Sequence, residues 1–149
     1  MTAGDGNTLL RAAIAAVRDC AATMETQATS LWQALPAVPM PEELRAAVVE
    51  LVAGLQDTSG RVTFELALLQ AELAEDRLDG ATAVKRLSAT DAAMMTAVAA
   101  LAEVVDPLEK AAERDEQHER AFVLVIEATG VMLQGLEKAR AAADTLVRA

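Results

Sequence analysis

The side chains of this chain best suited to chemistry are three charged residues, Asp115, His118 and Glu119. His118 is the single histidine, and an imidazole tuned by a nearby carboxylate can act as a general acid or base. Carboxylates and one imidazole can also ligate a divalent metal ion. If the apolar seam at Leu108 continues to Phe122 in one helix, heptad spacing puts Asp115 and His118 at interior positions. This pattern suggests a polar layer inside a helical bundle.

Antiparallel helices would bring a third ligand to the same layer. If the chain reverses near Asp106, and once more before it, His118 lies level with Glu65 on an earlier helix. The sequence therefore suggests a metal site formed by Asp115, His118 and Glu65. Two simpler interpretations stay open. The segment 107–120 is a solvated helix end with i,i+4 ion pairs, or the layer is a buried polar contact that fixes helix register.

A second acidic group lies at the end of the second predicted helix. Glu72, Glu75, Asp76 and Asp79 occupy the negative end of the helix dipole, where carboxylates lower helix stability. A basic partner surface would offset this cost. We therefore expect these residues, together with Trp32 at the end of the first helix, to contact a protein partner. Solubility is the alternative explanation, since exposed helix faces are normally charged.

The chain carries no recognised catalytic or cofactor-binding motif. It has no glycine-rich phosphate loop, no Gly-x-Ser-x-Gly turn and no second histidine for a dinuclear metal site. Cys20 is the only cysteine, so neither an intramolecular disulfide nor a cysteine cluster can form. The sequence thus gives no positive sign of an enzyme, and we expect no cofactor.

Composition narrows the class of protein. The chain has 149 residues and a formal net charge of −10, which leaves no basic face for nucleic acid. The longest apolar stretches, Ala92–Ala102 and Ala121–Ile126, are shorter than the roughly 18 residues of a membrane-spanning helix. The N-terminus lacks the basic region of a signal peptide. We therefore expect a cytoplasmic protein with no transmembrane segment.

Apolar residues recur at spacings of three and four along most of the chain, which predicts long amphipathic helices. Breaks are expected at Pro36–Pro41, at Asp79–Gly80 and at Asp106–Pro107. Asp57–Gly60 interrupts the second helix in composition, but the apolar phase continues across it, so we expect that helix to be continuous. The first helix should begin at Asn7 or Thr8.

These elements predict an all-α fold: an antiparallel up-down bundle of about four long helices with alanine- and leucine-rich seams. We expect residues 1–7 to form a flexible N-terminus and residues 8–149 to form a single domain.

The function that fits these features is a non-enzymatic helical interaction or assembly module, such as an adaptor, a chaperone-like binder or an oligomeric scaffold subunit. Its partner would be another protein or a second copy of the chain. Two alternatives remain: an amphipathic protein that binds a small apolar ligand or a granule surface, and a carboxylate and histidine metal-binding bundle. A bundle fold by itself implies none of them.

Overall fold

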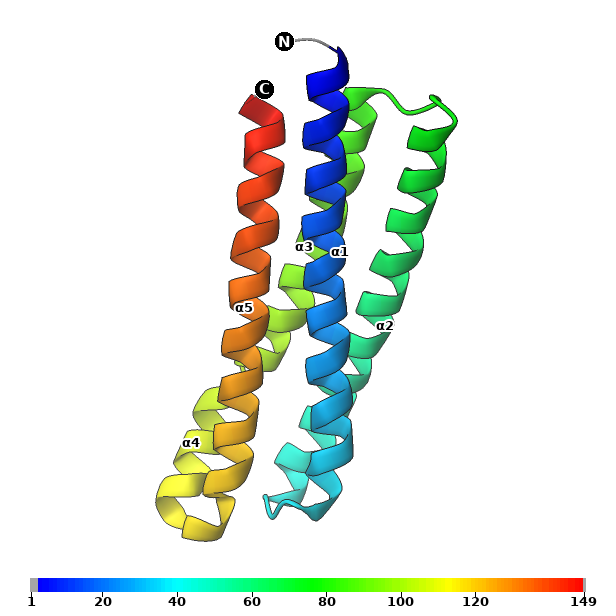
Figure 1. Cartoon of the computed structure of the whole chain (residues 1–149). Coiled ribbons are helices and arrows are strands. Elements are labelled where there is room, and N and C mark those ends of the chain that lie inside the picture. The colour runs from blue at the N-terminus through cyan, green and yellow to red at the C-terminus, as the bar shows by residue number, and fades with distance from the viewer. Residues whose placement is uncertain (1–2, 149) are drawn as a thin grey trace.

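A computed structural model of the chain describes residues 3–148 and confirms the expected antiparallel all-α bundle (Figure 1). All regular elements in that range are helical. They are α1 (Ala3–Ala34), η1 (Leu35–Ala37), α2 (Glu42–Ala74), α3 (Gly80–Ala102), α4 (Val105–Arg114), η2 (Glu116–His118) and α5 (Glu119–Arg148).

Four helices alternate in direction around a shared core. α1 packs against α2, α3 and α5, and its contacts with α5 and α2 are the most extensive in the molecule. α3 closes the ring by packing against α2 and α5, whereas α4 packs mainly against α5. The start of α1 and the end of α5 lie at the same end of the bundle, and the α4–η2 turn lies at the opposite end (Figure 1).

α1 supplies the longest seam of this core. Burying an aliphatic side chain of leucine size contributes about 2 kcal/mol, so a seam this long dominates the packing. The buried side chains of α1 recur at helical spacing and include Ile14, Val17, Ala21, Met24, Ala28 and Leu31.

α1 begins at Ala3, ahead of the start expected at Asn7 or Thr8. The segment expected to be a flexible N-terminus, residues 1–7, is thus helical from residue 3. Its two glycines each disfavour a helix by about 1 kcal/mol, but they do not prevent one from extending. Residues 1, 2 and 149 lie outside the described range.

The proline-rich turn between α1 and α2 is held by an arginine. Arg45, in the first turns of α2, donates from Nη1 to the Leu35 carbonyl at 2.6 Å and from Nη2 to the Val38 carbonyl at 2.7 Å. These carbonyls follow the end of α1, where backbone acceptors lack helical partners. Pro41 precedes the first residue of α2 and sets the start of that helix.

α2 is continuous through Asp57–Gly60, as expected. Two polar side chains of this stretch find partners within the helix, and the first is Ser59, whose hydroxyl donates to the Gln56 carbonyl at 2.9 Å. Arg61 pairs with Asp57 one turn away at 2.9 Å. The buried apolar seam therefore continues, and the polar stretch does not become a turn.

α2 ends at Ala74, earlier than the expected boundary near Asp79. The backbone N–H of Arg77 donates to the Glu72 carbonyl, and that of Asp76 donates to the Leu73 carbonyl. This pair of bonds is a Schellman motif, which places the residue after the C-cap in the left-handed region. That residue is Asp76, with φ of 58°.

The segment after Asp106, which was expected to form one last helix, forms the two helices α4 and α5. The chain reverses its direction at η2, between them, and not at Asp106–Pro107 as expected. Pro107 has no N–H, and its ring would clash with the carbonyl of Glu103 four residues earlier. Accordingly α3 ends at Ala102, and α4 starts after a break of two residues. α4 continues away from α3 to the far end of the bundle, where the chain turns into α5 (Figure 1).

Asp76→Gly should stabilise the protein. Glycine adopts the left-handed region without the steric cost that other residues incur. We expect the free energy of unfolding to rise by about 1 kcal/mol, measured by urea denaturation. Glu75→Gly is the matched control, because Glu75 has a negative φ of −90°. A gain for both variants, or for neither, would contradict this explanation.

Candidate interaction surface

The metal layer expected from Asp115, His118 and Glu65 is not assembled. Its prediction assumed one helix from Leu108 to Phe122, but the chain leaves the helix at Asp115, so the heptad phase is lost. Asp115 instead caps η2: its Oδ1 accepts from the backbone N–H of Gln117 at 3.1 Å. This bond is the main reason that the pKa of Asp115 lies below its usual range.

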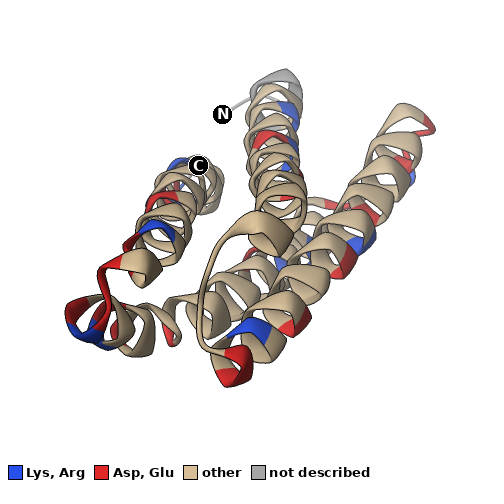
Figure 2. Cartoon of the chain, turned by 90° about the horizontal axis from the view of Figure 1, so that it is seen from below, with Lys and Arg blue, Asp and Glu red and all other residues tan. Residues whose placement is uncertain are grey.

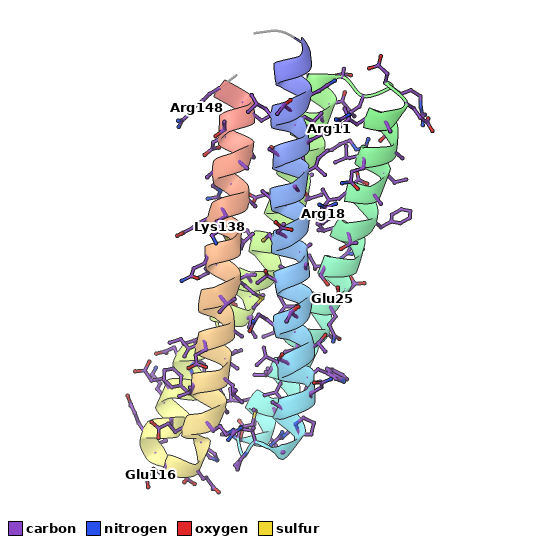
Figure 3. All side chains as sticks on the ribbon, viewed as in Figure 1. Arg11, Arg18, Glu25, Glu116, Lys138 and Arg148 are labelled. Atoms are coloured by element: carbon purple, nitrogen blue, oxygen red, sulfur yellow. The ribbon has the colours of Figure 1, made fainter. Side chains whose placement is uncertain are left out.

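Glu65 lies on α2 and accepts from the guanidinium of Arg86 at 2.6 Å. Asp115 and His118 lie instead at the α4–η2 turn, at the end of the bundle where Figure 3 labels Glu116. Among residues 3–148, no group of three or more His, Cys, Asp or Glu side chains is placed to hold a metal ion.

Three of the four acidic residues at the end of α2 use their side chains in contacts within the chain. Glu72 pairs with Arg86, and Glu75 with Arg77. Asp79 caps α3: its carboxylate accepts from the backbone N–H and from the hydroxyl of Thr82, both at 2.8 Å. These bonds lower the pKa of Asp79, with the backbone bond contributing most.

Trp32 is 48% exposed near the end of α1, beside a hollow formed with Leu35, Pro36, Arg45 and Val49. Asp76 and Asp79 lie in the connection between α2 and α3, at the other end of the bundle (Figure 1). The structure therefore does not bring Trp32 and the acidic residues together in one surface.

Asp91 and Cys20 are the polar groups that reach towards the interior between α1, α3 and α5. Arg140 of α5 pairs with Asp91 of α3 at 3.5 Å, and the second carboxylate oxygen of Asp91 is buried without a hydrogen-bond partner in the described structure. Cys20 is buried in the contact between α1 and α5, next to Gly135. Burial, and then the charge of Asp91, raises the pKa of the Cys20 thiol to about 11.

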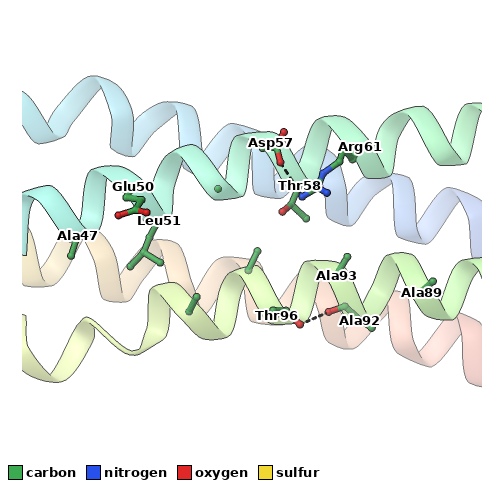
Figure 4. A pocket seen from close by; sticks show the side chains of 13 residues that line it. Ala47, Glu50, Leu51, Asp57, Thr58, Arg61, Ala89, Ala92, Ala93 and Thr96 are labelled. Carbon is green, nitrogen blue, oxygen red and sulfur yellow. Dashed lines mark hydrogen bonds and ion pairs between the residues drawn. The ribbon is translucent and has the colours of Figure 1, made fainter.

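A long concave feature lies between α2 and α3. It is an open groove of about 980 Å³ along the two helices (Figure 4). Glu50, Gly54, Asp57 and Arg61 line it from α2. The α3 side is made of small side chains: Ala89, Ala92, Ala93, Thr96, Ala97 and Ala100.

The groove exists because little fills the space between the outer edges of these two helices. Near the Gly80 end of α3, Arg86 joins the helices by ion pairs to Glu65 and Glu72. Beyond Arg86 the α3 residues that face α2 are mostly alanines, and Gly54 of α2 has nothing within 4 Å of where a Cβ would stand. Small side chains leave room that leucines would occupy.

The outer face of α3 beside this groove is unusually apolar. Between Arg86 and Glu103 the only charged residue is Asp91, whose side chain is 16% exposed. Figure 2 shows the acidic and basic residues on other parts of the bundle, including the α4–η2 turn. The groove therefore adjoins a neutral surface on a chain of net charge −10.

The same apolarity bears on the expectation that the chain has no transmembrane segment. By length and composition, one helical segment, Gly80–Arg114, is apolar enough to cross a membrane, although no uninterrupted apolar run in it is long enough. An 18-residue window in it has a mean hydropathy of 1.3, with 22% of the window buried. A single helix of this kind is weak evidence for a membrane span.

α2 carries an outward stripe that the sequence interpretation missed. Phe64 is 67% exposed and Leu68 is 41% exposed, one turn apart. The signal was available as a second heptad pattern on α2, offset from the buried seam. The part of this stripe beside the groove is the outer stripe of α2, and it consists of Ala47, Glu50, Gly54, Asp57, Arg61 and Phe64.

Comparisons of the chain with protein-family models, with curated proteins and with solved structures found no match.

Cys20 should react slowly with thiol reagents. A pKa of about 11 in place of 9.0 lowers the thiolate fraction at pH 8 about 100-fold. We expect at least this ratio between the rates of alkylation in urea and in native buffer. A control chain carrying Cys20→Ala and Ala92→Cys should react rapidly when folded. Fast native labelling of Cys20 would contradict its burial.

The same shift predicts a dependence of stability on pH. The folded thiol holds its proton more tightly than the unfolded one, so its contribution is complete below pH 9 and is lost as pH rises towards 11.

Asp79→Ala should lower stability in a pH-dependent way. The folded-state pKa of Asp79 is lowered, so its capping contribution is present above the usual pKa of 3.8 and is lost as pH falls through the lowered value. We expect the urea midpoints of wild type and Asp79→Ala to differ at pH 7 and to converge in acid. Asp79→Asn keeps a capping oxygen and should retain most of the stability at both pH values. Equal midpoints at pH 7 would rule out the cap.

Proposed function

We propose that this chain is a non-enzymatic interaction module that binds a protein through the α2–α3 groove, in a soluble, cytoplasmic setting. The observation that carries the proposal is the groove of about 980 Å³ beside the uncharged outer face of α3. Contiguous apolar surface of this kind is characteristic of protein interaction sites.

The shape of the groove suits an amphipathic helix. Helix-in-groove recognition places the apolar face of one helix between two others, with anchors at spacings of three and four. The alanines of α3 allow the backbone of such a helix to approach closely, and Glu50 and Asp57 on the α2 side add polar contacts. Docking would cover the part of α3 that the bundle leaves exposed.

A photo-crosslinker placed in the groove tests this proposal. Ala92→p-benzoylphenylalanine, expressed in the cells the protein comes from, should yield a discrete protein adduct on irradiation. Ala141→p-benzoylphenylalanine is the matched control, because Ala141 is exposed on α5 away from the groove. An adduct at position 92 alone, identified by mass spectrometry, supports the proposal.

The result that would overturn it is the lack of an adduct specific to position 92. Flotation of the purified chain with phospholipid vesicles provides the competing measurement. Vesicle binding that Ala92→Lys abolishes, without any protein adduct, would assign the apolar face to a lipid or granule surface instead.

A further inference from the structure

We infer that the protein bound at this face is a second copy of this chain, packed against it through α2 and α3 about a two-fold axis that crosses both helices, so that the Phe64 side chain of each copy, and not a whole helix, enters the groove of the other. Each helix would then lie antiparallel to its own copy, in an isologous interface. This inference rests on the proposed function and names its partner. Three independent features of the described residues support it.

The first feature is charge complementarity along the outer stripe of α2. Glu50 and Arg61 stand at equal distances on either side of the midpoint between Leu55 and Gln56. A two-fold axis at this midpoint therefore places Glu50 of each copy opposite Arg61 of the other. Glu50 makes no ion pair within the described chain, and Arg61 pairs with Asp57 on the surface. Glu50 is therefore free to form the contact between copies, and Arg61 would give up or share its exposed pair with Asp57 to form it.

The second feature is the charge pattern of α3. Thr58 lies opposite Thr96 across the groove (Figure 4), so the same axis passes α3 just beyond Thr96. This level lies between Asp91 and Glu103, in the part of α3 that carries no charged residue. Two facing copies of α3 therefore bring no like charges together close to the axis.

The third feature is complementarity of size. About the same axis, the exposed ring of Phe64 falls opposite Ala47 of the other copy. Ala47 lines the groove together with Leu51 and Ala100, where the side chains leave a hollow. A large exposed side chain at one end of the stripe thus meets small ones at the other, twice in each dimer. Aromatic anchors that fill pockets carry much of the energy in such interfaces.

A charge swap tests the register. Multi-angle light scattering across a concentration series should show a dimer for the wild type. Glu50→Arg and Arg61→Glu should each raise the dimer dissociation constant by about tenfold or more, because each places like charges together twice. The double variant restores both pairs and should recover most of the affinity. Glu25→Arg, on the exposed side of α1, is the matched control and should change nothing (Figure 3).

Disulfide trapping tests the same contact by the proximity of the two positions instead of by their charges. In a Cys20→Ala background, a mixture of Glu50→Cys and Arg61→Cys chains should form a cross-linked heterodimer on mild oxidation. A mixture of Glu25→Cys and Arg61→Cys chains should not. Circular dichroism of each variant checks that the substituted surface residues leave the helices intact.

The outcomes separate this inference from the proposed function. A strict monomer at every concentration, or a double variant no better than the single ones, overturns the two-fold dimer. If the position-92 adduct then contains a different protein, the groove still binds a protein, and only the identity of the partner is wrong. If no adduct forms, the proposed function fails as well.

Discussion

The burial of the α1 seam is the constraint on which the rest of this bundle depends. α1 packs against three helices, and its apolar side chains occupy the centre of the core from Leu10 to Leu31. α2 and α3 turn their own seams towards this centre. Each therefore has few large side chains left for the outer edge of its contact with the other. The α2–α3 pair is joined at one end by Arg86 and widens into a groove where alanine and glycine line both helices.

Charge is distributed in a way that favours this surface. The acidic residues near the end of α2 are used inside the chain: Glu72 and Glu65 hold Arg86, and Asp79 caps α3. The remaining acidity keeps most of the surface strongly negative, which opposes nonspecific association. The outer face of α3 is an exception, since its central part carries no exposed charge. A specific contact at this face avoids most of the repulsion that the net charge of −10 imposes elsewhere.

Periodicity predicted the helical fold, the antiparallel order and the continuity of α2, because long apolar seams depend on local spacing. It failed where two signals compete. Pro107 was interpreted as a reversal, although a proline can break a helix while the chain continues onward. The true reversal at Asp115 lies in a charged segment without glycine or proline, so nothing in the local pattern marked it. That error moved the expected position of His118 along the hairpin and created a metal layer that the structure does not contain. The ion pair between Arg140 and Asp91 agrees with the observed reversal, because the two residues lie at equal distances along the chain from about residue 116.

The groove was beyond sequence reasoning for a different reason. Alanine at a helical position indicates close packing equally well whether a neighbour covers it or not, so composition cannot tell a tight contact from an open one. Alanines also bury little area each, and a groove lined by them alone would hold a partner weakly. Phe64 and Leu68 supply the missing bulk on the same face. The hollow beside Ala47 and the large Phe64 side chain occur on the same chain, in positions that an antiparallel two-fold axis exchanges. This surface therefore favours binding of a second copy of the chain over binding of an unrelated helix.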